Sequence, residues 1–362
     1  MPRKSYPVPL VISPVRNEHT HTIIALHGRG SNAERFGREI LASANLQNRL
    51  PTVKFVFPTA SKRRSTILKR VPINQWYDNY SLDDPGERTD LQIEGLCETA
   101  EFLRDLITNE AHILGAGGYR KIILWGLSQG CAAGIFTVLG GWGDNSTTNA
   151  IGAFVGMSGW LPFEQHLKEI LRCDDDSELA GDNSRYESQS DDHDGDDRDI
   201  SSDEDLEKDE WSDSELEDDL FHQPGQPNDD FNPFMEEEEE TDIPPAIQAV
   251  NYIRDILDLP MLSTDEESPS LSPKDPLSPS NLYQLQIPIF IGHGAEDPKV
   301  SVRLGEKMSQ VLSKGLGMDL TWKSYEGLGH WYRAEDEIQD ILKFLQTRVN
   351  LPVEDDLPVS NS

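Results

Sequence analysis

Ser128, His330 and Asp297 are the residues of this chain whose types and spacing suit nucleophilic catalysis. Ser128 lies at the centre of GLSQG (residues 126–130), which follows the short apolar run 121–126. In a G-x-S-x-G elbow the serine occupies a strained strand-to-helix turn, and the glycines remove side chains that would collide there. The alternative is a helix that begins after a strand with an incidental serine. The buried-strand pattern before the pentapeptide favours the nucleophile.

A nucleophilic serine needs a general base, and the base needs an acid that orients it. His330 stands in a glycine-containing loop, GLGHWY, after the last expected strand and before the last expected helix. Asp297 stands in GHGAEDP, on the loop after the preceding strand, where its neighbour Glu296 is a rival acid. The chain order of serine, aspartate and histidine is the order of an α/β-hydrolase triad.

Backbone amides near Ser128 could stabilise the negative charge that develops on a carbonyl oxygen under attack. The first donor is expected to be the amide of Gln129, at the N-terminus of the helix that follows the serine. The second is expected from LHGRGS (residues 26–31), which ends an early strand. We expect the amide of Arg29 there, because the adjacent glycines let the backbone curl toward Ser128. An ordinary strand exit is the alternative.

Six short motifs together resemble the phospholipase/carboxylesterase family, which includes acyl-protein thioesterases. They are LHGRGSN, INQWYD, GLSQG, SGWLP, GHGAEDP and GLGHWY, and the resemblance covers almost all of residues 20–172 and 283–348. It implies esterase or thioesterase activity on a small acyl ester or an acylated protein, palmitoylated proteins included, with no metal and no cofactor. It also implies that Trp76 lies near the site. The predicted substrate pocket is lined by Trp76, Leu127, Trp160 and Trp331.

Two features depart from the family pattern. Arg29-Gly30-Ser31 stands where Leu-Gly-Asp usually follows the His-Gly pair. An arginine at the mouth of the site makes a long acyl chain less expected and an acidic or smaller substrate more so. The acidic segment between SGWLP and GHGAEDP is the second departure, because it is no part of the usual pattern.

Outside the acidic segment, short apolar runs alternate with longer amphipathic ones. Most of the short runs are apolar throughout, which is typical of strands covered on both faces. This order predicts an α/β-hydrolase fold, with a mostly parallel central sheet and helices on both faces. The expected strands are 21–28, 52–58, 121–126, 152–159, 287–294 and 319–325; the expected helices are 33–42, 129–139, 300–312 and 334–349, with one more that begins near Asp90.

The net charge of -33 is concentrated in one segment. Residues 173–282 hold 37 acidic and 5 basic residues, which leaves 28 acidic and 27 basic residues elsewhere. We therefore expect a hydrolase domain over 1–172 and 283–362, interrupted by an acidic insertion over 173–282. The insertion is expected to be largely disordered, because its like charges and few apolar residues cannot offset the entropy of ordering.

One stretch of the insertion, residues 246–257, carries apolar residues at helical spacing after a proline start. The insertion leaves the sheet on the side that bears the triad. We therefore hypothesise that this helix docks as a mobile apolar lid or partner helix near the pocket. A plain loop expansion, which costs little closure entropy, is the alternative.

Composition argues against several functional classes. The near-neutral remainder lacks the basic surface of a nucleic-acid-binding protein. Cys97, Cys131 and Cys173 are odd in number and form no CxxC pair, which suits a reducing compartment without a disulfide framework or a zinc site. No apolar run reaches the roughly 18 residues of a membrane span. We expect no stable membrane insertion and a cytoplasmic protein, with the nucleus as the alternative.

The main alternative to an enzyme is a non-catalytic interaction protein. Its polyanionic insertion would bind basic protein partners through salt-sensitive contacts. A complete set of triad and oxyanion residues argues against this interpretation, because a scaffold need not keep them.

Overall fold

The structure is a computed structural model that describes residues 5–142, 150–173, 243–262 and 282–355. All of these residues belong to one structural unit. Most of the predicted insertion, including its expected disorder, lies outside the described residues. The described part of the chain contains no helix that is both long and apolar enough to cross a membrane.

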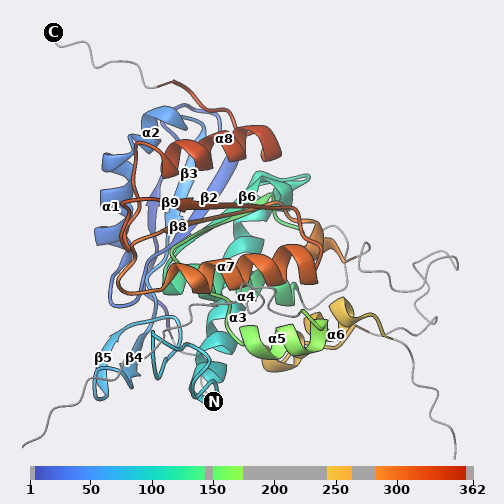
Figure 1. The fold of residues 1–362 in the computed structure, drawn as a ribbon. Coiled ribbons are helices and arrows are strands. Elements are labelled where there is room, and N and C mark those ends of the chain that lie inside the picture. Colours follow the sequence, from blue (N-terminus) through green and yellow to red (C-terminus); the bar gives the residue numbers. More distant parts are fainter. Residues whose placement is uncertain (1–4, 143–149, 174–242, 263–281, 356–362) are drawn as a thin grey trace, which may run out of the picture. The chain divides into compact units, whose positions relative to one another are not determined.

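A seven-stranded sheet forms the centre of the unit, in the strand order β1-β3-β2-β6-β7-β8-β9 (Figure 1). β1 is antiparallel to β3, and every other neighbouring pair is parallel. The expectation of a mostly parallel sheet is confirmed. The strands are β1 (Leu10–Ile12), β2 (His21–Leu26), β3 (Val53–Phe57), β6 (Ile122–Leu127), β7 (Ala153–Met157), β8 (Ile289–Gly294) and β9 (Leu320–Tyr325).

Helices cover both faces of the sheet, and most coincide with the amphipathic runs of the sequence. The expected helix 300–312 is divided, because its last turn, η4, is a π-helix. The helical elements are α1 (Ala33–Ser43), α2 (Leu46–Arg49), α3 (Asp90–Leu114), η1 (Gly118–Lys121), α4 (Gln129–Gly140), α5 (Glu164–Leu171), α6 (Pro245–Ile256), η3 (Tyr283–Gln286), α7 (Val302–Gln310), η4 (Val311–Gly315) and α8 (Glu337–Val349).

Alternate side chains of the central strands enter two separate hydrophobic cores. On β2, Ile23 and Ala25 join the core built with α1 and α8, whereas Ile24 and Leu26 join the core built with α3, α4 and α7. All four side chains are at most 2% exposed. A strand buried on both faces has no polar face to show, which explains why these runs are apolar throughout.

A small hairpin that the sequence did not predict lies outside the main sheet. β4 (Lys62–Ser65) and β5 (Val71–Asn74) pair antiparallel. The basic residues of β4 mask the alternation of apolar and polar side chains by which a strand is recognised in a sequence. β1, with three residues, was also missed. The hairpin matters for the site, because β5 leads directly into the loop that contains Trp76.

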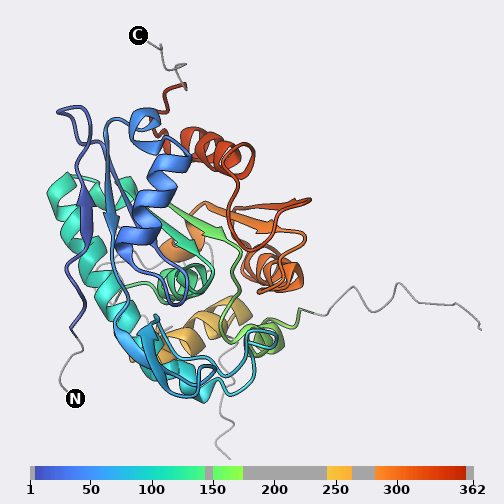
Figure 2. The ribbon, with the colours of Figure 1, turned by 90° about the vertical axis from the view of Figure 1, so that its left-hand side faces the viewer.

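The amphipathic helix of the insertion, α6, is packed into the unit rather than placed as a lid. Val250 and Ile253 are fully buried in the core that also contains α4. Figure 2 shows α6 in yellow beside α5 in green, and the two helices are in contact. Arg254 Nη1 donates to the carbonyl oxygens of Gly140 (2.8 Å) and Trp142 (3.0 Å), at the C-terminal end of α4.

The lid hypothesis for residues 246–257 therefore does not hold. The apolar face of α6 is already covered by the core. Its arginine binds α4 at the end opposite Ser128, and the 12 residues of α4 separate the two ends by about 18 Å. The apolar spacing predicted the helix within one residue at each end, but it could not show which surface the helix would cover.

Candidate active site

Ser128 occupies a sharp turn between β6 and α4. Its backbone angles, φ 56° and ψ -122°, lie in a region that residues with a Cβ rarely adopt. Gly126 and Gly130 permit the turn: a Cβ on Gly126 would lie 2.4 Å from the carbonyl oxygen of Gly130, and one on Gly130 would lie 2.5 Å from that of Leu26. The two glycines of GLSQG are thus required by close backbone contacts, as the motif predicts.

The structure brings Ser128, His330 and Asp297 together from three different loops. His330 Nε2 lies 3.0 Å from Ser128 Oγ, and His330 Nδ1 lies 2.8 Å from Asp297 Oδ2. The loops follow β6, β8 and β9, so that parallel strands deliver all three side chains to the carboxyl edge of the sheet. Both distances are those of hydrogen bonds, and the geometry is that of a serine-histidine-aspartate triad.

Asp297 is held as a carboxylate by its surroundings. Burial favours the neutral acid, but hydrogen bonds from His293, His330 and the amides of Val300 and Lys299 outweigh it and hold the pKa of Asp297 well below its usual range. The two amides donate to Oδ1 at 3.0 Å and 2.8 Å, which leaves Oδ2 for the histidines. A fixed negative charge at this position can stabilise a protonated His330.

Glu296, the rival acid, makes its hydrogen bond to a residue other than His330. Its side chain is exposed, and its Oε1 accepts a hydrogen bond from the amide of Gly327 at 3.2 Å. The acid that contacts His330 is Asp297.

The two expected oxyanion donors lie beside Ser128. Gln129 is the first residue of α4, so its amide has no acceptor within the helix. The loop of Arg29 abuts the serine, because a Cβ on Gly28 would lie 3.9 Å from Ser128 Oγ. Gly30, with φ 80°, turns the chain and donates its amide to the carbonyl oxygen of Asn74 at 2.8 Å. Their assignment to an oxyanion hole stays a prediction.

The side chain of Gln129 ties the elbow to the loop after β5. Its Oε1 accepts from the amide of Trp76 (3.0 Å), and its Nε2 donates to Tyr77 O and Asn79 Oδ1 (both 2.8 Å). Trp76 Nε1 in turn donates to the carbonyl oxygen of His27 at 2.8 Å. The loops that carry the two expected oxyanion donors are therefore cross-linked through fully buried hydrogen bonds.

His27 serves this network in its neutral form. Burial lowers its pKa to about 4, against the opposing effect of the Gly28 carbonyl. Its Nε2 accepts the amide of Ala60 at 3.0 Å, and its Nδ1 donates to Gly28 O at 2.7 Å. The histidine thereby holds the start of the Arg29 loop.

Three of the four predicted pocket residues are part of the protein interior. Trp76 is 0% exposed, and Leu127 and Trp160 are each 1% exposed. Trp331, next to His330, is 37% exposed and meets Phe36 edge to face. Of the four, Trp331 is therefore the side chain that could contact a substrate without rearrangement. Trp76 instead stabilises the site through its hydrogen bonds to Gln129 and His27.

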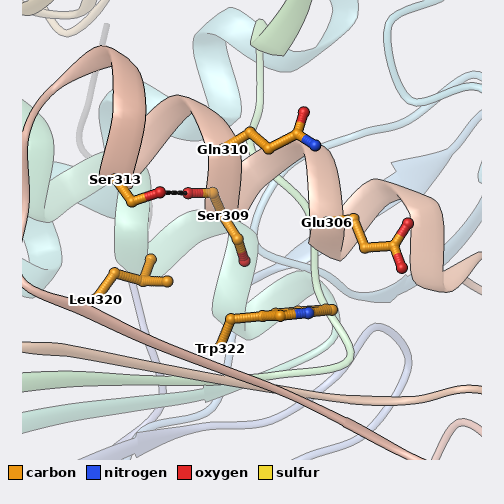
Figure 3. A pocket seen from close by; sticks show the side chains of 6 residues that line it. All are labelled: Glu306, Ser309, Gln310, Ser313, Leu320 and Trp322. Atoms are coloured by element: carbon orange, nitrogen blue, oxygen red, sulfur yellow. Dashed lines mark hydrogen bonds between the residues drawn. The ribbon is translucent and has the colours of Figure 1, made fainter. Parts of the chain in front are cut away.

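A cavity of about 340 Å³ lies between α7 and β9 (Figure 3), and no residue of the triad lines it. Its lining residues come from α7, η4 and β9: Glu306, Ser309, Gln310, Ser313, Leu320 and Trp322. None of these residues had been predicted to bind substrate. Within the described ranges, no group of three or more His, Cys, Asp or Glu side chains is arranged to hold a metal ion.

His293 is the site residue that sequence reasoning missed. Its side chain is fully buried, its Nε2 lies 3.5 Å from Asp297 Oδ2, and it is 2.9 Å from the carbonyl oxygen of Val300. The residue ends the apolar run of β8, where a histidine looks like part of the strand. The spacing of four residues to Asp297 was the available signal.

Comparison with known proteins points in one direction. The sequence model of a family described as Phospholipase/Carboxylesterase matches residues 8–175 and 270–349, which is more than half of the chain. Acyl-protein thioesterase 1 of Yarrowia lipolytica is 33% identical over 163 residues, which are 44% of this chain and 66% of that protein. Acyl-protein thioesterase 1 of Cryptococcus neoformans is 27% identical over 164 residues, 45% of this chain and 63% of that protein. The matched part thus spans less than two thirds of either relative.

The solved structures agree in fold. The crystal structure of acyl-protein thioesterase 2 from Zea mays matches with a TM-score of 0.52 and 19% sequence identity, over 94% of this chain and 98% of that chain. At this identity the likeness concerns the fold alone, which is that of an α/β-hydrolase.

Proposed function

Because the chain belongs to the phospholipase/carboxylesterase family, we propose that it hydrolyses carboxylic ester or thioester bonds with Ser128 as the nucleophile. The observation that carries this proposal is the hydrogen-bonded chain from Ser128 Oγ through His330 to Asp297. A serine hydroxyl is a weak nucleophile by itself and becomes effective when a positioned base takes its proton. His330 Nε2 is the atom in that position.

In the first half of the reaction Ser128 Oγ attacks the carbonyl carbon while His330 Nε2 takes the hydroxyl proton. Asp297 orients the imidazole through Nδ1 and stabilises its positive charge. The amides of Arg29 and Gln129 donate to the oxyanion. The tetrahedral intermediate then expels the alcohol or thiol, which leaves with the proton from His330, and the acyl group stays on Ser128.

In the second half water replaces the leaving group. His330 takes a proton from the water, whose oxygen attacks the acyl carbon. Collapse of the second intermediate releases the carboxylic acid and returns the proton to Ser128 Oγ. This reaction is redox-neutral, and apart from the substrate and one water molecule it uses side chains and amides of the chain.

The names of the related proteins suggest the substrate class. Proteins named acyl-protein thioesterase match this chain in sequence and in fold. We therefore include S-acylated proteins among the substrates to be tested, beside small esters.

Steady-state hydrolysis of p-nitrophenyl butyrate and of a butyryl thioester by wild type and Ser128→Ala tests the proposal. The variant should lose at least about 10³-fold in kcat, as triad nucleophiles do. Ser158→Ala is the matched control, because Ser158 is also buried, with positive φ, just after the neighbouring strand β7. Equal rates for wild type and Ser128→Ala would refute the assignment.

The acid is tested by a second pair of variants. Asp297→Asn should lower kcat by about 10³- to 10⁴-fold, whereas Glu296→Gln should stay close to wild type, since Glu296 has no contact with His330. The reverse order of effects would move the role to Glu296.

A further inference from the structure

Arg29 carries a positive charge on the loop that abuts Ser128, and the proposed reaction leaves this charge unused. Arg29 follows Gly28, which lies against Ser128, and its side chain is half-buried. Only its backbone amide has a place in the mechanism above. The side chain therefore requires its own explanation.

Arg29 has no ion-pair partner within the described part of the chain. Its Nη1 is buried and donates to no acceptor there. Because the side chain as a whole is only half-buried, the other N–H groups of the guanidinium remain open to solvent. Desolvation lowers the pKa of Arg29, and the attraction of Asp78 only partly opposes this.

The carboxylate of Asp78, which attracts the Arg29 guanidinium, already accepts hydrogen bonds from other residues. Its Oδ1 accepts from the amides of Thr66 (2.9 Å) and Asn79 (3.1 Å) and from Gln75 Nε2 (3.2 Å). Its Oδ2 accepts from Thr66 Oγ1 at 2.5 Å. With these bonds made, Asp78 supplies long-range attraction to the guanidinium but no direct hydrogen bond.

The Arg29 side chain is not needed to hold its loop. The backbone already does so, because Gly30 N donates to Asn74 O at 2.8 Å and Asn74 Nδ2 donates to Ser31 O at 2.9 Å. Ser31 Oγ is a second buried polar atom of this loop with no partner among the described residues. Unpaired donors near a protein interior are costly unless a ligand completes them.

We propose that the guanidinium of Arg29 is a subsite for a carboxylate that the substrate carries close to its scissile carbonyl. This inference rests on the proposed function, whose reaction it makes specific for anionic esters or thioesters. A planar guanidinium binds a carboxylate through two parallel N–H donors, which a neutral substrate cannot use. The carboxylate can belong to the acyl group or to the leaving group, and the experiment separates the two.

Two pairs of esters locate the carboxylate. On the acyl side, p-nitrophenyl hemiglutarate is compared with p-nitrophenyl valerate, which has the same number of acyl carbons without the charge. On the leaving-group side, the butyrate ester of 4-hydroxybenzoate is compared with that of methyl 4-hydroxybenzoate. The quantity measured is the ratio of kcat/KM for the charged and the neutral ester, each corrected for uncatalysed hydrolysis.

Arg29→Gln should lower this ratio for one of the two pairs by about 10- to 100-fold, which is the effect of one charge-assisted hydrogen bond. Arg29→Lys, which keeps the charge but not the fork, should give an intermediate ratio. Arg35→Gln removes an exposed arginine of α1 and serves as the control for overall charge. It should leave both ratios unchanged.

A binding measurement keeps the inference independent of turnover. Glutarate binding to Ser128→Ala, followed by calorimetry, should weaken by at least about tenfold in Ser128→Ala/Arg29→Gln and should stay unchanged in Ser128→Ala/Arg35→Gln. Suppose that wild type hydrolyses neutral esters, but that Arg29→Gln changes neither the two kcat/KM ratios nor the affinity for glutarate. The subsite is then refuted and the proposed function stands. If no ester is cleaved, the proposed function fails, and glutarate binding alone decides the subsite.

Discussion

His293 Nε2 lies 3.5 Å from Asp297 Oδ2, the same oxygen that receives His330 Nδ1 at 2.8 Å. One carboxylate oxygen thus faces two imidazoles, one fully buried and one that reaches Ser128. The buried ring is also fixed by the carbonyl oxygen of Val300 at 2.9 Å. His293 therefore connects the end of β8 to the loop that presents the acid.

Replacement of His293 should slow the chemical step. His293→Asn cannot reach Asp297 or Val300, so Asp297 loses a contact that favours its charged form, and kcat should fall by about tenfold with little change in KM. His293→Gln can place its Nε2 near the original nitrogen and should recover most of the loss. Stopped-flow kinetics of the two variants check this. Equal defects in both would mean that His293 acts only through packing.

The backbone strain at Ser128 should be measurable as stability. Ser128→Ala keeps the Cβ in its unfavourable region, whereas Ser128→Gly removes it. We expect the free energy of unfolding of Ser128→Gly to exceed that of Ser128→Ala by about 1 kcal/mol, even though glycine has the more flexible unfolded state. Ser128→Gly should therefore unfold at the higher denaturant concentration. Urea unfolding of the two inactive variants measures the difference. A less stable glycine variant would show that the strain at Ser128 is smaller than the entropic cost of ordering glycine.

Glu337 should make stability depend on pH. Burial raises its pKa to about 8, with the Arg333 amide opposing and the charge of Asp336 adding to the shift. Since the folded pKa lies above the unfolded one, near 4.3, the contribution of Glu337 is complete below about pH 4. The free energy of unfolding then falls by about 1.4 kcal/mol per pH unit as the pH rises toward 8, because the unfolded chain releases a proton that the folded chain keeps.

Glu337→Gln, which cannot ionise, should therefore match wild type near pH 4 and become the more stable protein between pH 5 and 8. Glu335→Gln, an exposed neighbour, is the control. Chemical denaturation across this range gives the difference. A constant difference between Glu337→Gln and wild type would show that Glu337 is ionised in the folded protein.

Helix α6 should behave as part of the core. Ile253 is fully buried in it, so Ile253→Ala should lower the free energy of unfolding by roughly 2–5 kcal/mol. Asp255→Ala, on the exposed face of the same helix, should change it by less than about 0.5 kcal/mol. Thermal and urea unfolding of the pair measure this. If Ile253→Ala left the free energy of unfolding unchanged, α6 would have to be a loosely docked helix rather than part of the core.

The sequence was most informative where chemistry and backbone geometry share one motif. GLSQG needs its glycines because the backbone of Leu26 and Gly130 approaches within clashing distance, and that demand is visible in the residue types. The chain order of Ser128, Asp297 and His330 could likewise be predicted, since parallel strands deliver their following loops to one edge.

The contacts that depend on tertiary packing could not be read from spacing. Trp76 looked like a pocket wall, yet its indole N–H binds the His27 carbonyl in the interior. His293 looked like part of a strand, and α6 showed an apolar face without its partner. In each case the residue type was visible, but the surface it meets comes from a distant part of the chain.

The nucleophile is tested most directly by covalent labelling. Wild type, Ser128→Ala and Ser158→Ala are treated with a fluorophosphonate and analysed by intact mass, and the adduct is mapped by peptide fragmentation. We expect one adduct, on Ser128, in wild type and in Ser158→Ala, and none in folded Ser128→Ala. An adduct on another residue, or a folded wild type that takes no label, would contradict this expectation.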